Sequence, residues 1–391
     1  MREKIKALAR ERHAEIVALR RHFRAHPELS AKEYRTQEKV MEFLTGLGLQ
    51  PVKACGTGVV AEIKGTKPGR LIALRADMDA LPIPDECGQA YASKNSGVCH
   101  ACGHDGHMAM LLGAAAVLTQ LKDEMNGSIR LLFQPSEEQF PGGALGMIEA
   151  GGLEGVSEII GAHLWPAYPA GKMAVARGRM MASASVFHIT VQGKGGHSSM
   201  PHQAVSPILT GTQIVTAINS IVGCNVDPLE QVALAVCVFQ GGEAVNIIPE
   251  KVEIKGTLRC FDEEIRQSVF QRIEKICRNL CEANDAGFTL EKLIGYPALI
   301  NSPGPAARLL AAGAEMLGDE GVEVMTPVLA CEDFAYYLEK IPGAFMFIGT
   351  ANEKEATRYP LHHPRFDLDE TALRYGVEVL ANSAVHLLQN S

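Results

Sequence analysis

A short stretch near residue 100 concentrates side chains that bind metal ions. Residues 98–108 contain two cysteines, three histidines and an aspartate, and an apolar run typical of a helix follows at 109–118. Cys102 and His104 are separated by one residue just before this run, so both side chains can converge on one point. A helix N-terminus and a divalent cation would each favour the thiolate form of the cysteine. Thiolate, imidazole and carboxylate ligands together are accepted by zinc, manganese, cobalt and nickel.

Polar residues that could join this site follow short apolar runs elsewhere in the chain. The runs and the residues after them are 71–76 with Asp77 and Asp79, 128–133 with Glu137 and Glu138, 157–162 with His163, and 344–349 with His362. Helical patterns lie between most of the runs, which predicts an α/β sheet with helices on both faces. Ligands of such sheets bind beyond the carboxyl ends of the strands. The runs therefore predict one site that collects these side chains.

Two adjacent pairs in this set are expected to divide their roles. Side chains next to each other on an extended backbone point to opposite sides, so one of Glu137 and Glu138 can bind metal while the other faces the substrate as a general base. A proline after His363 favours an extended backbone there, so at most one of His362 and His363 should reach the metal. A solvated loop pair, a core histidine and a reduced core cysteine are the alternatives for such residues taken singly.

The segment 182–294 has a different pattern from the rest of the chain. The order of its predicted elements is strand, helix, strand, strand, helix, strand, at 184–191, 204–222, 231–239, 252–258, 263–283 and 288–294. This order is typical of a ferredoxin-like α+β unit. We therefore expect a catalytic, metal-binding α/β domain formed by residues 1–181 and 295–391, with a satellite domain inserted at 182–294. In the first domain, helices are predicted over the first ~25 residues and over 36–47.

The composition limits the class of protein. A chain of 391 residues with 47% hydrophobic and 21% charged residues is typical of a globular protein with two domains. The net charge of -8 and the lack of a basic run argue against nucleic-acid binding. The N-terminus lacks the apolar core of a signal peptide, and no run approaches the ~18 apolar residues of a membrane span. We expect a cytoplasmic protein with reduced cysteines.

Eight motifs follow one another over nearly the whole chain. They are Leu74–Pro82, Cys99–His107, Phe133–Glu138, Gly161–Trp165, Gly193–Ser199, Asn246–Pro249, Glu332–Phe334 and Leu361–Pro364. Together they resemble the M20 metallopeptidase superfamily, and specifically its amidohydrolase branch of N-acyl-amino-acid, hippurate and auxin-conjugate hydrolases. The resemblance implies two divalent metal ions per subunit, which could be zinc, manganese, nickel or cobalt. It also implies a homodimer or homotetramer formed through the satellite domain.

The resemblance assigns roles to individual residues of the first domain. The implied metal ligands are Cys102, His104, Glu138, His163 and His362. Glu137 takes the place of the general base. Asp77 and Asp79 occupy the place of a His-x-Asp motif of other branches, so they are expected behind the ligands rather than on the metal. Asp105 is expected either to cap the helix or to orient a ligand histidine from behind.

The resemblance also assigns roles in the satellite domain. His197, in a glycine-rich turn, matches a histidine that binds the substrate carbonyl, in some relatives from the neighbouring subunit. Asn246 and Arg259 match positions that hold the substrate carboxylate. The expected reaction is hydrolysis of an N-acyl amino acid to a carboxylic acid and a free amino acid, with closure of the satellite domain over the metals excluding water.

Three other functions are compatible with parts of the pattern. A metallo-carboxypeptidase or dipeptidase acting on short peptides would use the same site. A thiol hydrolase would use Cys102 as nucleophile with a nearby histidine as base, but would leave the two glutamates and the other histidines idle. A binding protein or structural zinc site would normally close with four ligands and no spare carboxylate. Loss of activity with a chelator would separate the metal enzyme from the thiol enzyme.

Overall fold

The computed structural model describes residues 1–389 of the chain. Its contacts divide the chain into two compact units. The larger unit comprises Met1–Met180, Ile300–Pro327 and the chain from Asp333 onward, and the smaller unit comprises Met181–Leu299 and Val328–Glu332. The larger unit is therefore discontinuous in sequence. Residues 328–332, which the sequence pattern placed with the α/β domain, belong by their contacts to the smaller unit.

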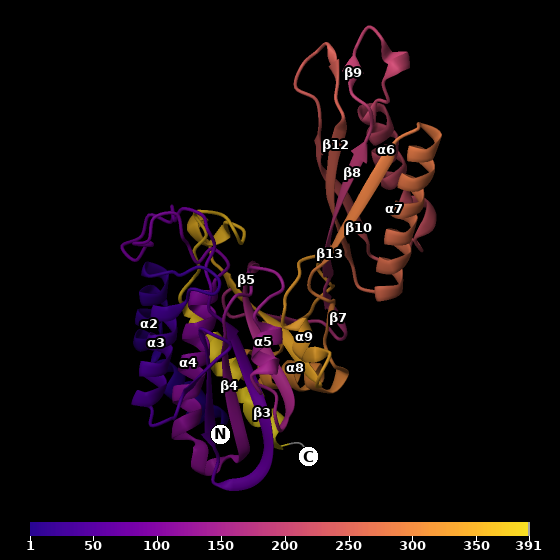
Figure 1. The fold of residues 1–391 in the computed structure, drawn as a ribbon. Coiled ribbons are helices and arrows are strands. Elements are labelled where there is room, and N and C mark those ends of the chain that lie inside the picture. The colour runs from indigo at the N-terminus through magenta and orange to yellow at the C-terminus, as the bar shows by residue number, and fades with distance from the viewer. Residues whose placement is uncertain (390–391) are drawn as a thin grey trace. The chain divides into compact units, whose positions relative to one another are not determined.

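The larger unit is built on one mixed sheet of eight strands, counted over the described residues (Figure 1). The sheet order is β1-β2-β4-β3-β5-β16-β6-β15, with bounds Val52–Ala54 (β1), Gly58–Lys64 (β2), Lys67–Asp77 (β3), Asn126–Gln134 (β4), Val156–Pro169 (β5), Met173–Val175 (β6), Val322–Val324 (β15) and Gly343–Ala351 (β16). The neighbouring strands β4, β3, β5 and β16 are parallel. Their carboxyl ends therefore lie at the same end of the sheet, where ligands of such sheets bind.

Helices cover both faces of this sheet. They are Arg2–Glu11 (α1), His13–Ala25 (α2), Tyr34–Gly46 (α3), His104–Gln120 (α4), Ala144–Glu149 (α5), Pro303–Leu317 (α8), Ala335–Leu338 (α9) and Thr371–Gln389 (α10), with 3-10 turns at Lys122–Glu124, Asp319–Gly321 and Glu355–Arg358. Adjacent strand residues point to opposite faces. Met346 of β16 joins the core that contains α4 and α10. Phe345 packs instead on Phe334, which precedes α9. The predicted α/β class is confirmed.

The central helix α4 is buried on every side. All of its residues from His104 to Leu118 are buried, and it packs against α2 and α10. A helix that is apolar all round is expected in this position, because no face of it meets water. The helix that begins with His104 is therefore held rigidly by the core of the larger unit.

Two element boundaries differ from the prediction. The N-terminal region forms two helices, α1 and α2, which divide at Arg12, although Arg12 itself keeps right-handed helical dihedral angles. The third predicted strand does not end before His163. β5 continues to Pro169, because its later residues keep a parallel register with β16. His163 is consequently a strand residue opposite Phe347.

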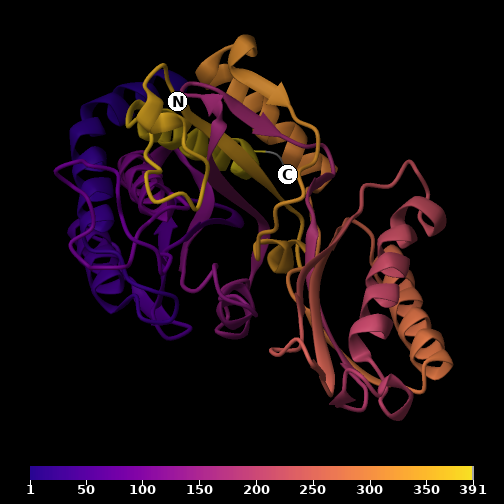
Figure 2. The same cartoon turned by 90° about the horizontal axis from the view of Figure 1, so that it is seen from above.

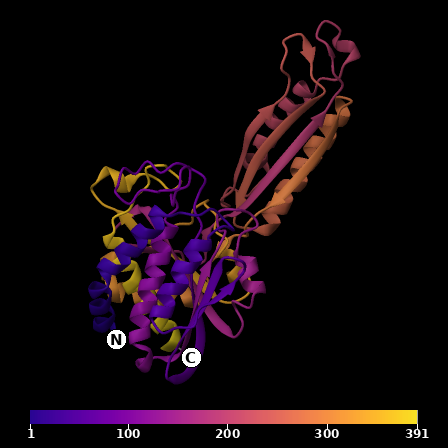
Figure 3. The ribbon, with the colours of Figure 1, turned by 60° about the vertical axis from the view of Figure 1, so that its left-hand side comes forward.

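The smaller unit has the predicted ferredoxin-like arrangement. Its sheet order is β10-β12-β8-β13 and all neighbours are antiparallel, with bounds Ser183–Gln192 (β8), Ala233–Gln240 (β10), Lys251–Cys260 (β12) and Gly287–Ile294 (β13). Two helices, Pro207–Asn225 (α6) and Glu263–Ala283 (α7), cover one face and share its core (Figures 2 and 3). Short pairs and turns complete the chain at Gly196–His197 (β9) with Ile247–Ile248 (β11), Arg179–Met181 (β7) with Leu299–Ile300 (β14), and Pro201–Gln203.

Helix α6 is the one helix among the described residues that is long and apolar enough to cross a membrane. This follows from its length and composition only, and a core helix of a globular unit can have the same length and composition. In this structure Ile214, Ile218 and Ile221 of α6 are buried in the core of the smaller unit.

Candidate metal centre

Side chains that lie far apart in the sequence meet in the larger unit. Cys102, His104 and His163 offer ligand atoms within 4.8 Å of one another, and so do Cys102, Glu138 and His362. Cys102 is common to both groups. The five side chains come from the loop before α4, the first residue of α4, strand β5, and the loops after β4 and β16. The parallel strands therefore bring together the ligand set that was predicted for them.

Asp79 holds the backbone of the two adjacent glutamates. The N–H groups of Glu137 and Glu138 donate to its two carboxylate oxygens at 2.9 and 3.0 Å, and the Ser30 hydroxyl donates to it at 2.6 Å. Ser136, just before the pair, has a positive φ of 56°. The glutamates thus lie in a turn that Asp79 stabilises, and not on the extended backbone that was expected.

Two buried histidines have tautomers that their neighbours determine. Nδ1 of His163 lies 2.7 Å from the carbonyl oxygen of Leu164, which can only accept, so Nδ1 carries the proton. Its Nε2 therefore offers a lone pair, and lies 3.5 Å from Sγ of Cys102. In His107, Nε2 accepts from the Leu164 N–H at 2.8 Å, and Nδ1 lies 2.6 Å from Asp77. His163 is therefore prepared to bind a cation, whereas both ring nitrogens of His107 are engaged.

His104 lies between carboxylates on both sides of its ring. Its Nδ1 is 3.4 Å from Asp79 and 3.7 Å from Asp77, and its Nε2 is 3.8 Å from Glu138. Burial opposes a charge on this ring, but the attraction of Asp77, Asp79 and Glu138 outweighs burial and raises the pKa of His104 to about 10. A carboxylate behind a histidine is the arrangement that orients metal-ligating imidazoles.

Several atoms at this centre are buried without a hydrogen-bond partner among the described residues. They are both ring nitrogens of His104 and Oε1 of Glu138. Buried polar atoms normally have partners, and an unmatched group of this kind calls for an ion or a water. The surrounding acidic side chains would repel one another without a cation. A thiolate, two or three imidazoles and a carboxylate fit a divalent transition metal.

The Cys102 thiol has an environment that disfavours its charged form. Burial first, and then the charges of Glu138, Glu137 and Asp77, hold the pKa of Cys102 well above its ordinary value. The neighbouring His163 cannot compensate as an imidazolium, because burial and the nearby His107 hold the pKa of His163 well below its ordinary value. A nucleophilic cysteine needs a low thiol pKa and an electropositive setting. The structure therefore favours Cys102 as a metal ligand over Cys102 as a nucleophile.

The two histidines before Pro364 are separated by the backbone. Nε2 of His362 lies 3.4 Å from Glu138, whereas His363 stacks on the Tyr359 ring at 4.5 Å and accepts from the Arg365 N–H. Only one of the two faces the centre, as predicted. The expected reason was wrong, because His362 has a φ of 65° and is not extended.

The aspartates expected behind the ligands have two different surroundings. Asp77 accepts from Arg75 at 2.7 Å and pairs with His107. Burial opposes its charge, but His104, His107 and Arg75 keep the pKa of Asp77 well below its ordinary value. Asp105 instead accepts from Nε of Arg20 at 2.7 Å. This bond joins Asp105 to helix α2 and not to a ligand histidine.

Several residues that support this centre had no role predicted from the sequence. Ser30 and Arg75 bond the aspartates directly, and His107 links Asp77 to strand β5. A signal for His107 was present, because residues three apart on a helix share a face, which places His107 beside His104. The serine and the arginine carried no such signal, since their partners are set by the fold.

The satellite residues lie at opposite ends of the smaller unit. His197 on β9 pairs with Ile247 on β11, and the Ser198 N–H donates to the Asn246 carbonyl, so His197 and Asn246 are neighbours. Arg259 lies near the far end of β12, opposite Ala184. It is eight steps along the strand from Lys251, or about 26 Å at 3.3 Å per residue. Arg259 is therefore not brought together with the other two.

His197 has a defined tautomer despite its exposure. Its Nδ1 accepts from the backbone N–H of Ser199 at 3.1 Å, and the Ser199 hydroxyl lies 2.8 Å from the same atom. A backbone N–H can only donate, so the proton of the neutral ring lies on Nε2. Nε2–H is thus a hydrogen-bond donor that points away from its own turn.

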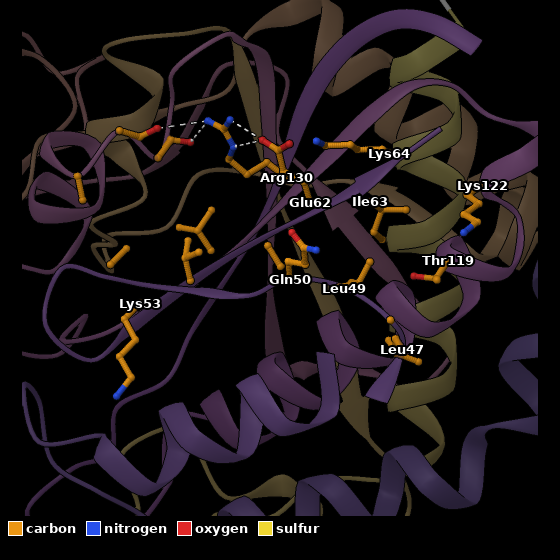
Figure 4. A pocket seen from close by; sticks show the side chains of 18 residues that line it. Leu47, Leu49, Gln50, Lys53, Glu62, Ile63, Lys64, Thr119, Lys122 and Arg130 are labelled. Carbon is orange, nitrogen blue, oxygen red and sulfur yellow. Dashed lines mark hydrogen bonds and ion pairs between the residues drawn. The ribbon is translucent and has the colours of Figure 1, made fainter. Parts of the chain in front are cut away.

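A separate hollow of about 630 Å³ lies along strands β1 and β2 (Figure 4). Leu47, Lys53, Lys64 and Lys122 are among its lining residues, and Arg130 is paired with Glu62 at its side. None of the five candidate metal ligands lines it. We therefore take the ligand cluster, and not this hollow, as the candidate functional site.

Comparison with known proteins assigns the family. The description "Peptidase family M20/M25/M40" matches residues 73–386, which covers all five candidate ligands. This chain belongs to that family. It is a hydrolase that binds metal and acts on amide bonds, and the predicted resemblance is confirmed.

Individual relatives are similar over most of their length. An N-acyl-L-amino acid amidohydrolase of Geobacillus stearothermophilus is 48% identical over 301 residues, which are 77% of this chain and 81% of that protein. Thermostable carboxypeptidase 1 of Saccharolobus solfataricus is 40% identical over 388 residues, 98% of each chain. The crystal structure of the YXEP protein of Bacillus subtilis, described as a dinuclear metal binding peptidase from the M20 family, superposes with a TM-score of 0.85 at 34% identity and covers 98% of this chain and 100% of its own.

Proposed function

We propose that this M20 hydrolase cleaves the amide bond of N-acyl amino acids to give a carboxylic acid and a free amino acid. The observation that carries the proposal is the ligand cluster, in which Cys102 belongs to two groups and Glu137 stands beside Glu138. An open site with a further carboxylate beside its ligands is typical of catalytic rather than structural metal centres. A relative at 48% identity carries the name of this activity.

The centre is proposed to hold two divalent ions that share Cys102. One ion would be held by Cys102, His104 and His163, and the other by Cys102, Glu138 and His362. Bound ions would supply Lewis acidity, which lowers the pKa of water and polarises a carbonyl oxygen. The donor set fits zinc, manganese, nickel and cobalt alike.

Glu137 is proposed as the general base. Asp79 accepts from the backbone N–H groups of both glutamates and so fixes the turn that carries the two carboxylates. Glu137 would take a proton from the attacking water and return it to the leaving amine nitrogen, so that the amide is cleaved without net change in the enzyme. His197 is proposed to donate its Nε2–H to the carbonyl oxygen as negative charge develops there.

The placement of the satellite residues supports a shared active site in an oligomer. His197 and Asn246 are neighbours, but Arg259 lies about 26 Å or more along β12 from that end of the unit. One smaller unit therefore cannot place all three side chains on a single small substrate. We propose that the protein is a homodimer or homotetramer, and that a partner subunit supplies His197 and Asn246 while the chain's own Arg259 holds the substrate carboxylate.

The second candidate is a metallo-carboxypeptidase or dipeptidase acting on short peptides. The name of a relative at 40% identity over 98% of the chain favours it. It would use the same ligands and the same general base, since a peptide bond is an amide with an amino acid as the acyl group. The two candidates differ only in the acyl group that the site accepts.

Release of free amine by the metal-free protein, with each metal added back, tests the proposal. The substrates are acetyl, benzoyl and indole-acetyl derivatives of several amino acids, with matched dipeptides alongside. We expect no release without metal, and turnover of at least one N-acyl amino acid with metal. Turnover of dipeptides alone would establish the second candidate. Hydrolysis that persists in the presence of a chelator would refute the metal-dependent mechanism.

A further inference from the structure

Helix α2 carries two buried arginines that bond residues near the candidate metal ligands. Arg20 and Arg24 are four residues apart, so they share one face of the helix, and both are 0% exposed. A buried charge is tolerated only where it is paired and hydrogen-bonded. The partners of these two side chains therefore show which parts of the chain they hold.

Arg24 bonds two of the segments that carry candidate metal ligands, those of Cys102 and His362. Its guanidinium pairs with Asp85 through two nitrogens at 2.8 and 2.9 Å. It also donates to the carbonyl of His100 at 2.7 Å and to the carbonyl of Phe366 at 2.8 Å. His100 lies two residues before Cys102, and Phe366 lies four residues after His362. One planar side chain thus fixes the spacing between the two ligand-bearing loops.

Arg20 makes a parallel pair of contacts one turn earlier. Its Nε bonds Asp105, next to His104, and another nitrogen bonds Asp367, both at 2.7 Å. The Tyr91 hydroxyl donates to the other oxygen of Asp367 at 2.8 Å. The start of α4 with the loop before it, and the segment before α10, are therefore bridged twice from one face of α2.

The bridged segments also touch each other directly. The His362 N–H donates to the Ala101 carbonyl at 2.9 Å, and Phe366 packs with Cys99 and Ala101 in a small apolar cluster. His362 itself has a positive φ of 65°, a backbone conformation that is strained for a residue other than glycine. Such a backbone persists only where its surroundings hold it, and Arg24 is part of those surroundings.

We propose that Arg24, supported by Arg20, is a positioning residue that sets the separation of Cys102 from His362 and so governs binding of the metal ion that these two ligands share. The inference rests on the proposed dinuclear centre. It adds that the second ion depends on helix α2, which supplies no ligand. The ion held by Cys102, His104 and His163 depends less on this bridge, because its other ligands lie on α4 and β5.

Cobalt titration of the metal-free protein tests the proposal. Calorimetry gives the number and affinity of the ions, and visible absorption reports thiolate and imidazole coordination. We expect two ions in the wild type. In Arg24→Ala we expect the first ion to bind nearly as in the wild type and the second about 10- to 100-fold more weakly, the usual effect of losing a group that supports a ligand. Arg24→Lys keeps the charge near Asp85 but cannot bond two carbonyls and a carboxylate at once, so it should weaken the second ion as well.

Arg130 provides the matched control. It pairs with Glu62 at 2.6 Å (Figure 4). It also donates to the carbonyls of Gly151, Gly152 and Glu154, so its bonding pattern is similar to that of Arg24. It bonds neither the segment of Cys102 nor the segment of His362, so Arg130→Ala should lower the melting temperature while both ions bind as in the wild type.

The outcomes separate this inference from the proposed function. Two ions at wild-type affinity in folded Arg24→Lys and Arg24→Ala would overturn the positioning role and leave the metal centre intact. Equal weakening of the second ion in Arg130→Ala would also overturn it, because the effect would then follow general stability. If Arg24→Ala does not fold, Arg24→Lys decides the matter. A wild-type protein that takes up no ion would overturn the metal centre and this inference together.

Discussion

The metal centre of the larger unit and the His197 turn of the smaller unit hold histidines proposed for one reaction, but they are held in opposite ways. His104 is 1% exposed and lies among the carboxylates of Asp77, Asp79 and Glu138. His197 is exposed, and its ring is fixed by the neighbouring Ser199. All five candidate metal ligands lie in the larger unit, whereas His197 lies in the smaller one and is proposed to act only on bound substrate. Metal binding and turnover should therefore respond separately to mutation.

Glu137→Ala should give the largest difference between the effect on turnover and the effect on metal binding. We expect turnover to fall by on the order of 10⁴-fold, because a general base contributes up to about that much, while both metal ions are retained. Steady-state kinetics and metal analysis of the purified variant measure the two effects. Glu138→Ala is the matched control and should lose metal. Loss of metal from Glu137→Ala instead would mean that the roles of the two glutamates are reversed.

His197→Ala tests the turn of the smaller unit in the same way, by its effects on turnover and on metal content. Removing one hydrogen-bond donor to a developing oxyanion typically reduces turnover by about two to three orders of magnitude. We expect this loss with metal content unchanged, since none of the five candidate ligands lies in the smaller unit. Ser199→Ala keeps the backbone N–H that fixes the ring, so it should retain most of the activity. Full activity of His197→Ala would remove that residue from the site.

Mixing two inactive variants tests whether the turn acts across subunits. Glu137→Ala and His197→Ala each lack one half of the proposed site. In a two-fold dimer with shared sites, random reassociation in equal amounts makes half of the dimers mixed, each with one intact site, which restores about a quarter of the wild-type activity. A mixture that stays inactive after complete subunit exchange would place His197 in its own chain's site.

Asp79→Asn should have a smaller effect on the metal centre. The asparagine keeps the shape but only one acceptor oxygen for the Glu137 and Glu138 N–H groups, and removes a charge beside His104. We expect metal affinity to fall by about 10- to 100-fold, as for other groups that support a ligand. Isothermal titration measures the change. Ser30→Ala removes only the hydroxyl bond to Asp79 and should weaken binding less.

The smallest effect concerns the stability of the metal-free protein at different pH values. The carboxylates raise the pKa of His104 to about 10, so the folded protein holds this proton more tightly than the unfolded chain. The resulting stabilisation is complete below pH ~6.5 and is lost as the pH rises towards 10. We expect the melting temperature of the metal-free protein to fall over this range, and the slope to decrease in His104→Gln. A slope that is unchanged in the variant would contradict this assignment.

The same shifts predict the pH dependence of metal binding. His104 must release its proton before Nε2 or Nδ1 can bind a cation, and Cys102 must release its own. Both pKa values are raised in the metal-free protein. Metal affinity should therefore increase with pH over the range in which stability of the metal-free protein decreases. Titrations at pH 6, 7 and 8 measure the trend.

The elements of both units could be predicted because their patterns are local. The alternation of apolar residues in 184–191 predicts a strand, and the helical spacing in 263–283 predicts a helix. The structure has β8 and α7 at these places. Boundaries were less certain where pairing decided them. β5 runs past His163 because β16 lies beside it, and nothing in the residues 163–169 alone indicates that partner.

The support of the candidate site was less predictable than its ligands. The ligands are recognisable together because polar residues follow several strands in succession, and the carboxyl ends of those strands are where such sheets bind ligands. Arg20, Arg24 and Ser30 are ordinary residues of a helix and a turn in the sequence. Their roles depend on which segments pack against them in the folded chain. Arg20 and Arg24 each bond a residue more than 300 positions away.

The amino-acid sequence by itself determined which residues could bind metal, which strands would carry them, and the order of elements in both units, because these features follow from residue type and short-range periodicity. The tertiary structure alone decided that Asp79 holds the turn of the two glutamates, that His362 faces the centre through a strained backbone, and that Arg259 is remote from His197. Each of these depends on contacts between segments that are distant in sequence, and the pattern of a single segment contains no information about the segment that will pack against it.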